Sequence, residues 1–253
     1  MILKHVFSNL FSLALLSTST SKNRYGEGPH YVRFELDFPD DDDNTKSSSF
    51  VVKLASEHYM PHSVHVFLEM VDHGLWDGCS FPLSAGHLIK ASPESYTDAE
   101  QDKMTPFEDA GLLRPSFPEY NSNYAHTEYT LGFVAAEGSN GFYINTEDNT
   151  DLHGPGAQEH NKLGLGTASA DPCFGEVITG RDVIDRIRSS PVGADGMTLQ
   201  RSVGIKKATV IQSSLSAGGN SPPKKSWPKI YFTKVTDAAM MAADRTPRRR
   251  QIS

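Results

Sequence analysis

The chain has 253 residues, of which 38% are hydrophobic and 22% are charged, a composition typical of globular proteins and not of fully disordered ones. Its formal net charge of −7 argues against a nucleic-acid binder that relies on overall positive charge, because phosphate contacts need a basic surface. The charge is unevenly divided: residues 213–253 carry +6 and residues 1–212 carry −13.

Residues 1–21 have the pattern of a secretory signal peptide. Lys4 precedes the apolar run Val6–Leu16, and small residues follow at Ser17–Ser21. An apolar run of about 11 residues suits a signal peptide and is too short to span a bilayer. We expect the chain to enter the secretory pathway, in the ER lumen or beyond the cell. The alternative is a cytoplasmic protein, and no membrane span is expected in the mature chain.

A β-hairpin is predicted after a linker at residues 22–29. Residues 31–38 alternate with period two, as a half-buried strand does, and residues 50–55 form a second apolar run. Four consecutive aspartates, Asp40–Asp43, lie between the two strands. Neighbouring residues on an extended chain point in different directions, so we expect a polar loop here and not a calcium site.

An amphipathic helix is predicted from Pro61 to Gly74, with its apolar positions at helical spacing. Its other side carries a polar stripe of His62, His65, Glu69 and His73. This stripe covers about 16 Å along the helix, too far for one metal ion to reach all four side chains. We therefore expect a solvated polar face.

The remaining segments predict more strands and one more short helix. Extended segments are expected at residues 80–89, 129–136, 141–146, 173–177 and 203–211, a helix at 182–187, and a long surface excursion at 93–123. Many strands with two short helices indicate a mainly β fold, a closed antiparallel barrel with helices over its ends. Residues 213–253 are expected to form a basic, disordered tail, and Cys79 and Cys173 to pair or to remain buried free thiols.

No motif of covalent, metal or nucleotide chemistry is present. The chain lacks Gly-x-Ser-x-Gly, His-Glu-x-x-His, a P-loop and the dinucleotide glycine fingerprint. No cofactor and no metal are therefore expected.

Six segments in order do resemble one family, the cyclophilin-type peptidyl-prolyl cis-trans isomerases. The first is the initial strand pair. The second is Met60-Pro61-His62-Ser63-Val64 through Phe67, and the third is Gly74-Leu75-Trp76-Asp77-Gly78-Cys79-Ser80-Phe81. The others are Tyr124-Ala125-His126-Thr127 through Ala135, Gly138 through Thr146, and Phe174 through Ile184. The resemblance implies a closed eight-stranded barrel over residues 30–212, capped by two short α-helices and carrying long loop insertions.

The resemblance also implies a peptide site, which this sequence alters. The family's catalytic Phe-His-Arg reads Phe81-Pro82-Leu83, so leucine replaces the arginine that donates a hydrogen bond to the prolyl nitrogen. The family's glutamine corresponds to Lys90 with a one-residue gap, or to Ala91 without it; we prefer Lys90. The family's pocket histidine becomes Asp171. The apolar positions that the resemblance assigns to peptide binding are Phe81, Leu88, Ala135, Tyr143 and Leu152.

Two functions remain open. The first is a divergent isomerase, weak or inactive because Leu83 replaces the arginine, that assists the folding of proline-containing polypeptides. The second is a non-catalytic peptide-binding or scaffold module on the same barrel. In both, the expected partner is a proline-containing peptide or protein and the chain is expected to be a monomer. His87 or Lys90 is a further candidate for the missing donor.

Overall fold

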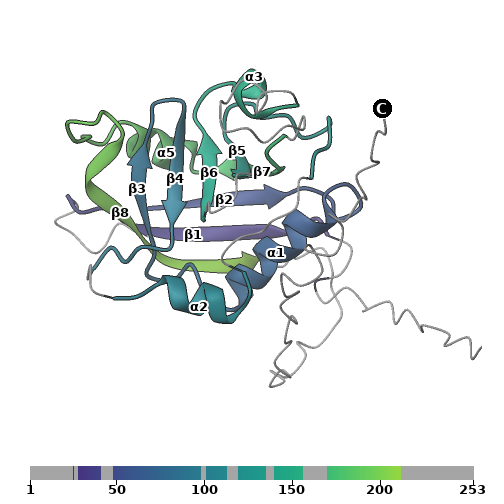
Figure 1. The fold of residues 1–253 in the computed structure, drawn as a ribbon, viewed down its shortest axis with the longest axis horizontal. Coiled ribbons are helices and arrows are strands. Elements are labelled where there is room, and N and C mark those ends of the chain that lie inside the picture. The colour runs from purple at the N-terminus through teal and green to yellow at the C-terminus, as the bar shows by residue number, and fades with distance from the viewer. Residues whose placement is uncertain are drawn as a thin grey trace, which may run out of the picture.

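Eight antiparallel strands close into one barrel in the computed structural model, which describes residues 25, 28–40, 48–97, 101–112, 119–134, 140–155 and 170–211 (Figure 1). The order around the barrel is β1-β2-β7-β5-β6-β4-β3-β8. The strands are β1 (Tyr31–Asp37), β2 (Ser48–Leu54), β3 (Ser80–Ser84), β4 (Leu88–Ser92), β5 (Thr130–Phe133), β6 (Phe142–Asn145), β7 (Cys173–Thr179) and β8 (Thr198–Ile211). The predicted barrel is confirmed.

The helices lie outside the strands. The two predicted ones are α1 (Pro61–Asp72), which packs against β8, and α5 (Arg181–Arg188), which packs against β2, β3 and β4. Figure 1 shows them on opposite sides of the barrel. Two shorter helices, α2 (Met104–Asp109) and α3 (Thr150–His153), were not predicted. No helix in the described ranges is long and apolar enough to cross a bilayer.

Period-two alternation explains how the first hairpin fills the barrel. Val32, Phe34 and Leu36 of β1 are buried, while Arg33 between them is exposed. Phe34 stacks on its cross-strand partner Phe50, with ring centroids 4.8 Å apart. Such stacked cross-strand rings stabilise a sheet beyond the area they bury. The barrel interior is therefore a packed aromatic core.

Phe142 on β6 lies at the centre of this core. Its ring centroid is 4.8 Å from that of Trp76, 5.4 Å from Phe67 and 5.8 Å from Phe81. The predicted surface excursion at residues 93–123 contributes here too, since Phe107 on α2 packs edge-on against Trp76. Part of that segment is thus core, and the prediction missed it.

The segment expected to be one extended stretch at residues 80–89 is a hairpin of β3 and β4. Gly86 reverses the chain with a φ of +82°, a conformation that glycine adopts without the strain of a side chain. The turn places Leu83 opposite Lys90 and Ser84 opposite Ile89. This pairing sets the face on which the predicted site residues lie.

Both cysteines are buried free thiols. Burial raises the pKa of Cys79 to about 12 and that of Cys173 to about 12. Each thiol donates to a backbone carbonyl, Cys79 to Leu75 and Cys173 to Ala125. At neutral pH both are protonated, so neither is a reactive nucleophile.

The carboxylate of Glu119 holds the start of α1. The helix has Pro61 in its first turn and no side-chain cap of its own. Glu119 accepts hydrogen bonds from the backbone N–H groups of His62 (3.1 Å) and Ser63 (2.8 Å) and from the Ser63 hydroxyl (2.6 Å). A carboxylate at a helix N-terminus satisfies free N–H groups and suits the helix dipole. This contact anchors the segment that leads to His126.

Candidate functional site

A row of cross-strand neighbours crosses β3, β4, β6 and β5 on one side of the barrel. Leu83 pairs with Lys90, Lys90 pairs with Tyr143, and Tyr143 pairs with Gly132. Residues in register on adjacent strands direct their side chains to the same face of a sheet. Lys90, and not Ala91, is therefore the residue directly beside Leu83.

Lys90 is a partly buried cation. Burial lowers the pKa of its ammonium group, and the carboxylate of Glu94 opposes this shift. Its side chain lies between an aliphatic residue, Leu83, and the aromatic Tyr143 on the two neighbouring strands. The row thus offers one amine donor beside an apolar position.

Tyr143 is completely buried and takes part in a polar network. Its hydroxyl oxygen lies 3.2 Å from His126 Nδ1 and 3.2 Å from Asp171 Oδ2, so its single proton is shared between two acceptors. Burial, followed by the nearby carboxylate of Asp171, raises the Tyr143 pKa well above its ordinary value. The hydroxyl therefore stays protonated at neutral pH, and its two contacts fix the position of the ring.

His126 completes the inner side of this network. Burial lowers its pKa to about 4, so the ring is neutral at pH 7. Its Nε2 lies 3.0 Å from the backbone carbonyl of Asp171 and donates to it, which leaves Nδ1 as the acceptor facing Tyr143. The arrangement satisfies both ring nitrogens without a charge on the ring.

His153 covers the outer side of Tyr143. Its Nδ1 lies 2.8 Å from Asp171 Oδ2, and its ring centroid is 4.9 Å from that of Tyr143. On the inner side, Gly132 leaves room for the ring, because a Cβ there would lie 2.6 Å from Tyr143 Cζ. Tyr143 is thus enclosed between Gly132 and His153, and its face is closed to solvent.

The structure brings together some of the predicted residues and separates others. Leu83, Lys90, Tyr143 and Asp171 form one connected region, whereas Phe81 is fully buried inside the barrel against Phe50 and Phe142. Leu88 is partly buried at the start of β4, opposite Asn145. Leu152, on α3, is 54% exposed. Ala135 lies outside the described residues.

Two members of the network, His126 and His153, were not predicted as site residues. The available signal was at Tyr143 and Asp171, where the sequence resemblance predicts phenylalanine and histidine. Both changes add polar groups to a buried position, and buried polar groups need partners. Finding those partners from sequence would have required knowing that residues 126, 143, 153 and 171 meet.

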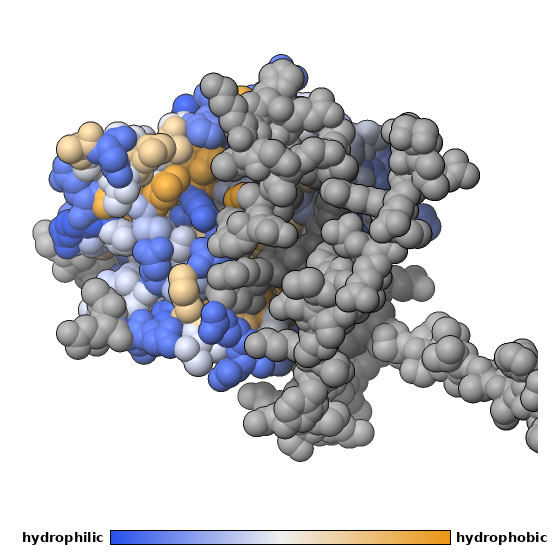
Figure 2. Space-filling view, viewed as in Figure 1, coloured by the Kyte–Doolittle hydropathy of each residue, from blue (hydrophilic) through white to orange (hydrophobic). Residues whose placement is uncertain are grey.

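One exposed apolar side chain, that of Met197, lies near Leu83 on the outer face. Met197, whose carbonyl accepts a hydrogen bond from the Ser84 N–H, is 47% exposed, and the adjacent Thr198 pairs with Leu83. Figure 2 shows hydrophobic surface over the β3–β4 hairpin, next to hydrophilic surface. An apolar side chain of a peptide would find van der Waals contacts here.

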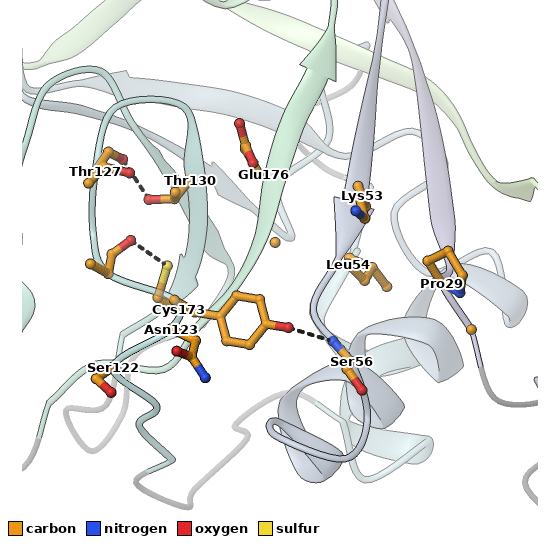
Figure 3. Close-up of a pocket in the computed structure, with 14 residues that line it drawn as sticks. Pro29, Lys53, Leu54, Ser56, Ser122, Asn123, Thr127, Thr130, Cys173 and Glu176 are labelled. Atoms are coloured by element: carbon orange, nitrogen blue, oxygen red, sulfur yellow. Dashed lines mark hydrogen bonds between the residues drawn. The ribbon is translucent and has the colours of Figure 1, made fainter.

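A cavity of about 590 Å³ lies elsewhere, over β2, β7 and residues 122–130 (Figure 3). Figure 3 shows Lys53, Leu54 and Ser56 on one side and Ser122, Asn123, Thr127, Thr130 and Cys173 on the other. The Tyr124 hydroxyl accepts a hydrogen bond from the Ser56 N–H across it (3.0 Å). None of the predicted site residues lines this cavity. The cavity and the row of predicted site residues therefore occupy different parts of the barrel.

Comparison with known proteins gives one family match. The profile described as "Cyclophilin type peptidyl-prolyl cis-trans isomerase/CLD" matches residues 42–210. No curated protein matches. Among solved structures, a cyclophilin-type isomerase from Cryptosporidium parvum is similar, with a TM-score of 0.49 and 14% identity over 73% of this chain and 98% of its own. A second structure, in the presence of the dipeptide Ala-Pro, has the same TM-score and identity over 72% and 99%.

Proposed function

Because the chain belongs to the cyclophilin-type peptidyl-prolyl cis-trans isomerase family, we propose that it binds proline-containing polypeptides and isomerises them weakly or not at all. This proposal rests on Leu83, which the sequence resemblance assigns to the position of the family's catalytic arginine and which pairs with Lys90 in the sheet. The client would be a peptide segment that contacts the outer face of β3 and β4.

The reaction explains why the donor matters. Rotation about an X–Pro bond must cross a barrier of about 18–20 kcal/mol, because the amide is conjugated. No covalent step is needed; a donor that hydrogen-bonds the prolyl nitrogen lowers the barrier as that nitrogen loses conjugation. Each 1.36 kcal/mol of selective transition-state stabilisation changes the rate tenfold. A leucine side chain has no N–H to donate.

Lys90 does not reproduce the missing arginine. An arginine presents several N–H groups in a fixed plane, whereas a lysine carries one flexible, strongly hydrated ammonium group. Burial lowers the pKa of Lys90, which shows that its surroundings disfavour the charged form. A flexible ammonium group on a neighbouring strand, without the fixed plane of N–H donors, supports weak catalysis at most.

The closed face of Tyr143 favours the second candidate, a non-catalytic peptide-binding or scaffold module. The His153 ring, held by Asp171, covers the Tyr143 ring. Tyr143 therefore has no exposed surface against which a proline ring could pack. The exposed apolar residues Leu152 and Met197 remain available for contacts with a partner. Binding without turnover would then rely on the outer face alone.

A pair of measurements on the purified chain separates these functions. We expect kcat/KM for a proline tetrapeptide to be at least about tenfold below that of an arginine-bearing family member, a loss of at least about 1.4 kcal/mol in transition-state stabilisation. Binding of proline peptides is followed separately by chemical-shift changes in the NMR spectrum of the labelled chain. Equal catalytic rates would contradict the proposal, and weak rates with peptide shifts at β3 and β4 support it.

We also propose that the chain enters the secretory pathway. The support is the N-terminal pattern of residues 1–21, which lie outside the described residues. Expressed in a eukaryotic cell, the chain should be found in a membrane-enclosed compartment or in the medium. Intact-mass measurement should show that it has lost about 21 residues. A full-length chain in the cytosol would refute this assignment.

A further inference from the structure

Two histidines and an asparagine meet where the turn before β4 faces α3. His87 lies in that turn; Asn149 immediately precedes α3 and His153 ends it, four residues later. The Asn149 side chain donates to the backbone carbonyl of His87 at 2.8 Å, which ties the two elements together. The rings of His87 and His153 are nearly parallel, 18° apart, with centroids separated by 6.2 Å.

Both histidines are fixed in the same tautomer by oxygen acceptors. His153 Nδ1 lies 2.8 Å from Asp171 Oδ2, and His87 Nδ1 lies 3.1 Å from the Ala85 carbonyl. An oxygen acceptor at Nδ1 requires the proton of a neutral ring to be there, which leaves the lone pair on Nε2. Histidines that bind metals are held in this way, by a carboxylate or a backbone carbonyl at the other ring nitrogen.

Two polar atoms of this cluster are shielded from solvent and have no hydrogen-bond partner among the described residues: His153 Nε2 and Asn149 Oδ1. Asn149 itself is completely buried. Its Nδ2 donates to the His87 carbonyl and to Asn145 Oδ1 (2.7 Å), so the orientation of the amide is fixed and Oδ1 is left over. A buried acceptor without a donor costs free energy unless something else satisfies it.

We propose that His87 Nε2, His153 Nε2 and Asn149 Oδ1 bind one divalent transition-metal ion of the imidazole-preferring kind, with Zn²⁺ as the ion to test. Imidazole nitrogen is a preferred ligand of Zn²⁺, Cu²⁺ and Ni²⁺, and an oxygen donor and water can fill the remaining positions around Zn²⁺. The described ranges contain no group of three or more His, Cys, Asp or Glu residues that could hold a metal ion. The site proposed here is of another kind, because its third ligand is the amide of an asparagine.

The ring spacing is compatible with one shared ion. With a Zn–N distance of about 2.0–2.1 Å, each ring centroid lies about 3.2 Å from the ion, so two rings on one ion can be at most about 6.4 Å apart. The observed 6.2 Å is near that upper limit. Tetrahedral binding would therefore bring His87 and His153 about 1 Å closer together.

Zn²⁺ titration of the full chain, stripped of metal with a chelator, tests the proposal. We expect calorimetry to show one Zn²⁺ per chain, and His87→Gln and His153→Gln each to weaken its binding at least about tenfold. The matched control is His65→Gln, an exposed histidine on α1, which should bind Zn²⁺ like the wild type. Circular dichroism checks that each variant is folded.

A measurement on the wild-type chain tests the proposal even if a variant does not fold. Side-chain ¹⁵N NMR should show Zn²⁺ shifting the Nε2 signals of His87 and His153 while leaving those of His126, whose nitrogens both have partners. Three results would overturn the proposal: no saturable binding, binding that both glutamine variants retain, or shifts confined to the histidines of α1. Because none of these readouts involves a peptide, the outcome is separate from that of the proposed function.

Discussion

Replacing Leu83 by arginine is expected to raise kcat/KM for a proline tetrapeptide at least about tenfold, or at least about 1.4 kcal/mol in transition-state stabilisation. Leu83 is on β3, partly exposed and beside Lys90, so a longer side chain can extend outward without entering the core. The guanidinium would supply the N–H donors that leucine lacks. Rates are measured by protease-coupled absorbance or by exchange NMR, with kcat and KM separated.

Two further substitutions at the same position serve as controls. Leu83→Met keeps an apolar side chain of similar volume and should leave the rate unchanged. Leu83→Lys supplies a charge without the planar group and should give a smaller gain than arginine. If Leu83→Arg folds normally and its rate equals that of the wild type, the missing donor is not what limits this chain. The claim that Leu83 sets the low activity would then be wrong.

Replacing Asp171 by alanine is expected to lower the free energy of unfolding by about 2 kcal/mol. The carboxylate is 1% exposed and accepts from the Tyr143 hydroxyl and from His153 Nδ1. Its removal leaves His153 Nδ1 without its acceptor and the Tyr143 hydroxyl with His126 Nδ1 as its one remaining acceptor. An unsatisfied buried polar group costs about 1–3 kcal/mol. Urea denaturation followed by tryptophan fluorescence and circular dichroism measures the change.

Asp109→Ala is the matched control for this change. Asp109 is the same residue type, is exposed at the end of α2, and should alter the free energy of unfolding by less than about 0.5 kcal/mol. Asp171→Asn retains one acceptor oxygen and should fall between the two. A loss below about 1 kcal/mol for Asp171→Ala would mean that the network of Tyr143, His126 and His153 contributes little to the fold.

Much of the fold could be predicted because local patterns determine it. The alternation of Val32, Phe34 and Leu36 marks β1, and the apolar spacing of Val64, Phe67 and Val71 marks α1. The β3–β4 turn was missed because a single residue, Gly86, reverses the chain there with a positive φ. The short helices α2 and α3 were missed because they have too few residues for helical periodicity to show.

The candidate site was only partly predictable, for a different reason. The positions of Leu83 and Lys90 follow from neighbouring segments, and the sheet places them side by side. The closure of Tyr143 depends instead on contacts with His126, His153 and Asp171, residues that lie 10 to 28 positions away in the chain and on different elements. A polar residue at a buried position shows from the sequence that hydrogen-bond partners are needed. Only the folded barrel shows which residues are those partners.

The pairing of β1 with β8 bears on how this protein is made. Tyr31 lies opposite Ile211, and Val32 opposite Val210, so the first and last strands of the barrel close it against each other. During synthesis, β1 and β3 have an unpaired edge until β8 has left the ribosome, and exposed edges invite pairing with other chains. Assembly of the native barrel must therefore wait until nearly the whole domain has been translated. A chain whose biosynthesis stops before Thr198 would leave the edges of β1 and β3 unpaired, whereas β8 pairs with both in the complete barrel.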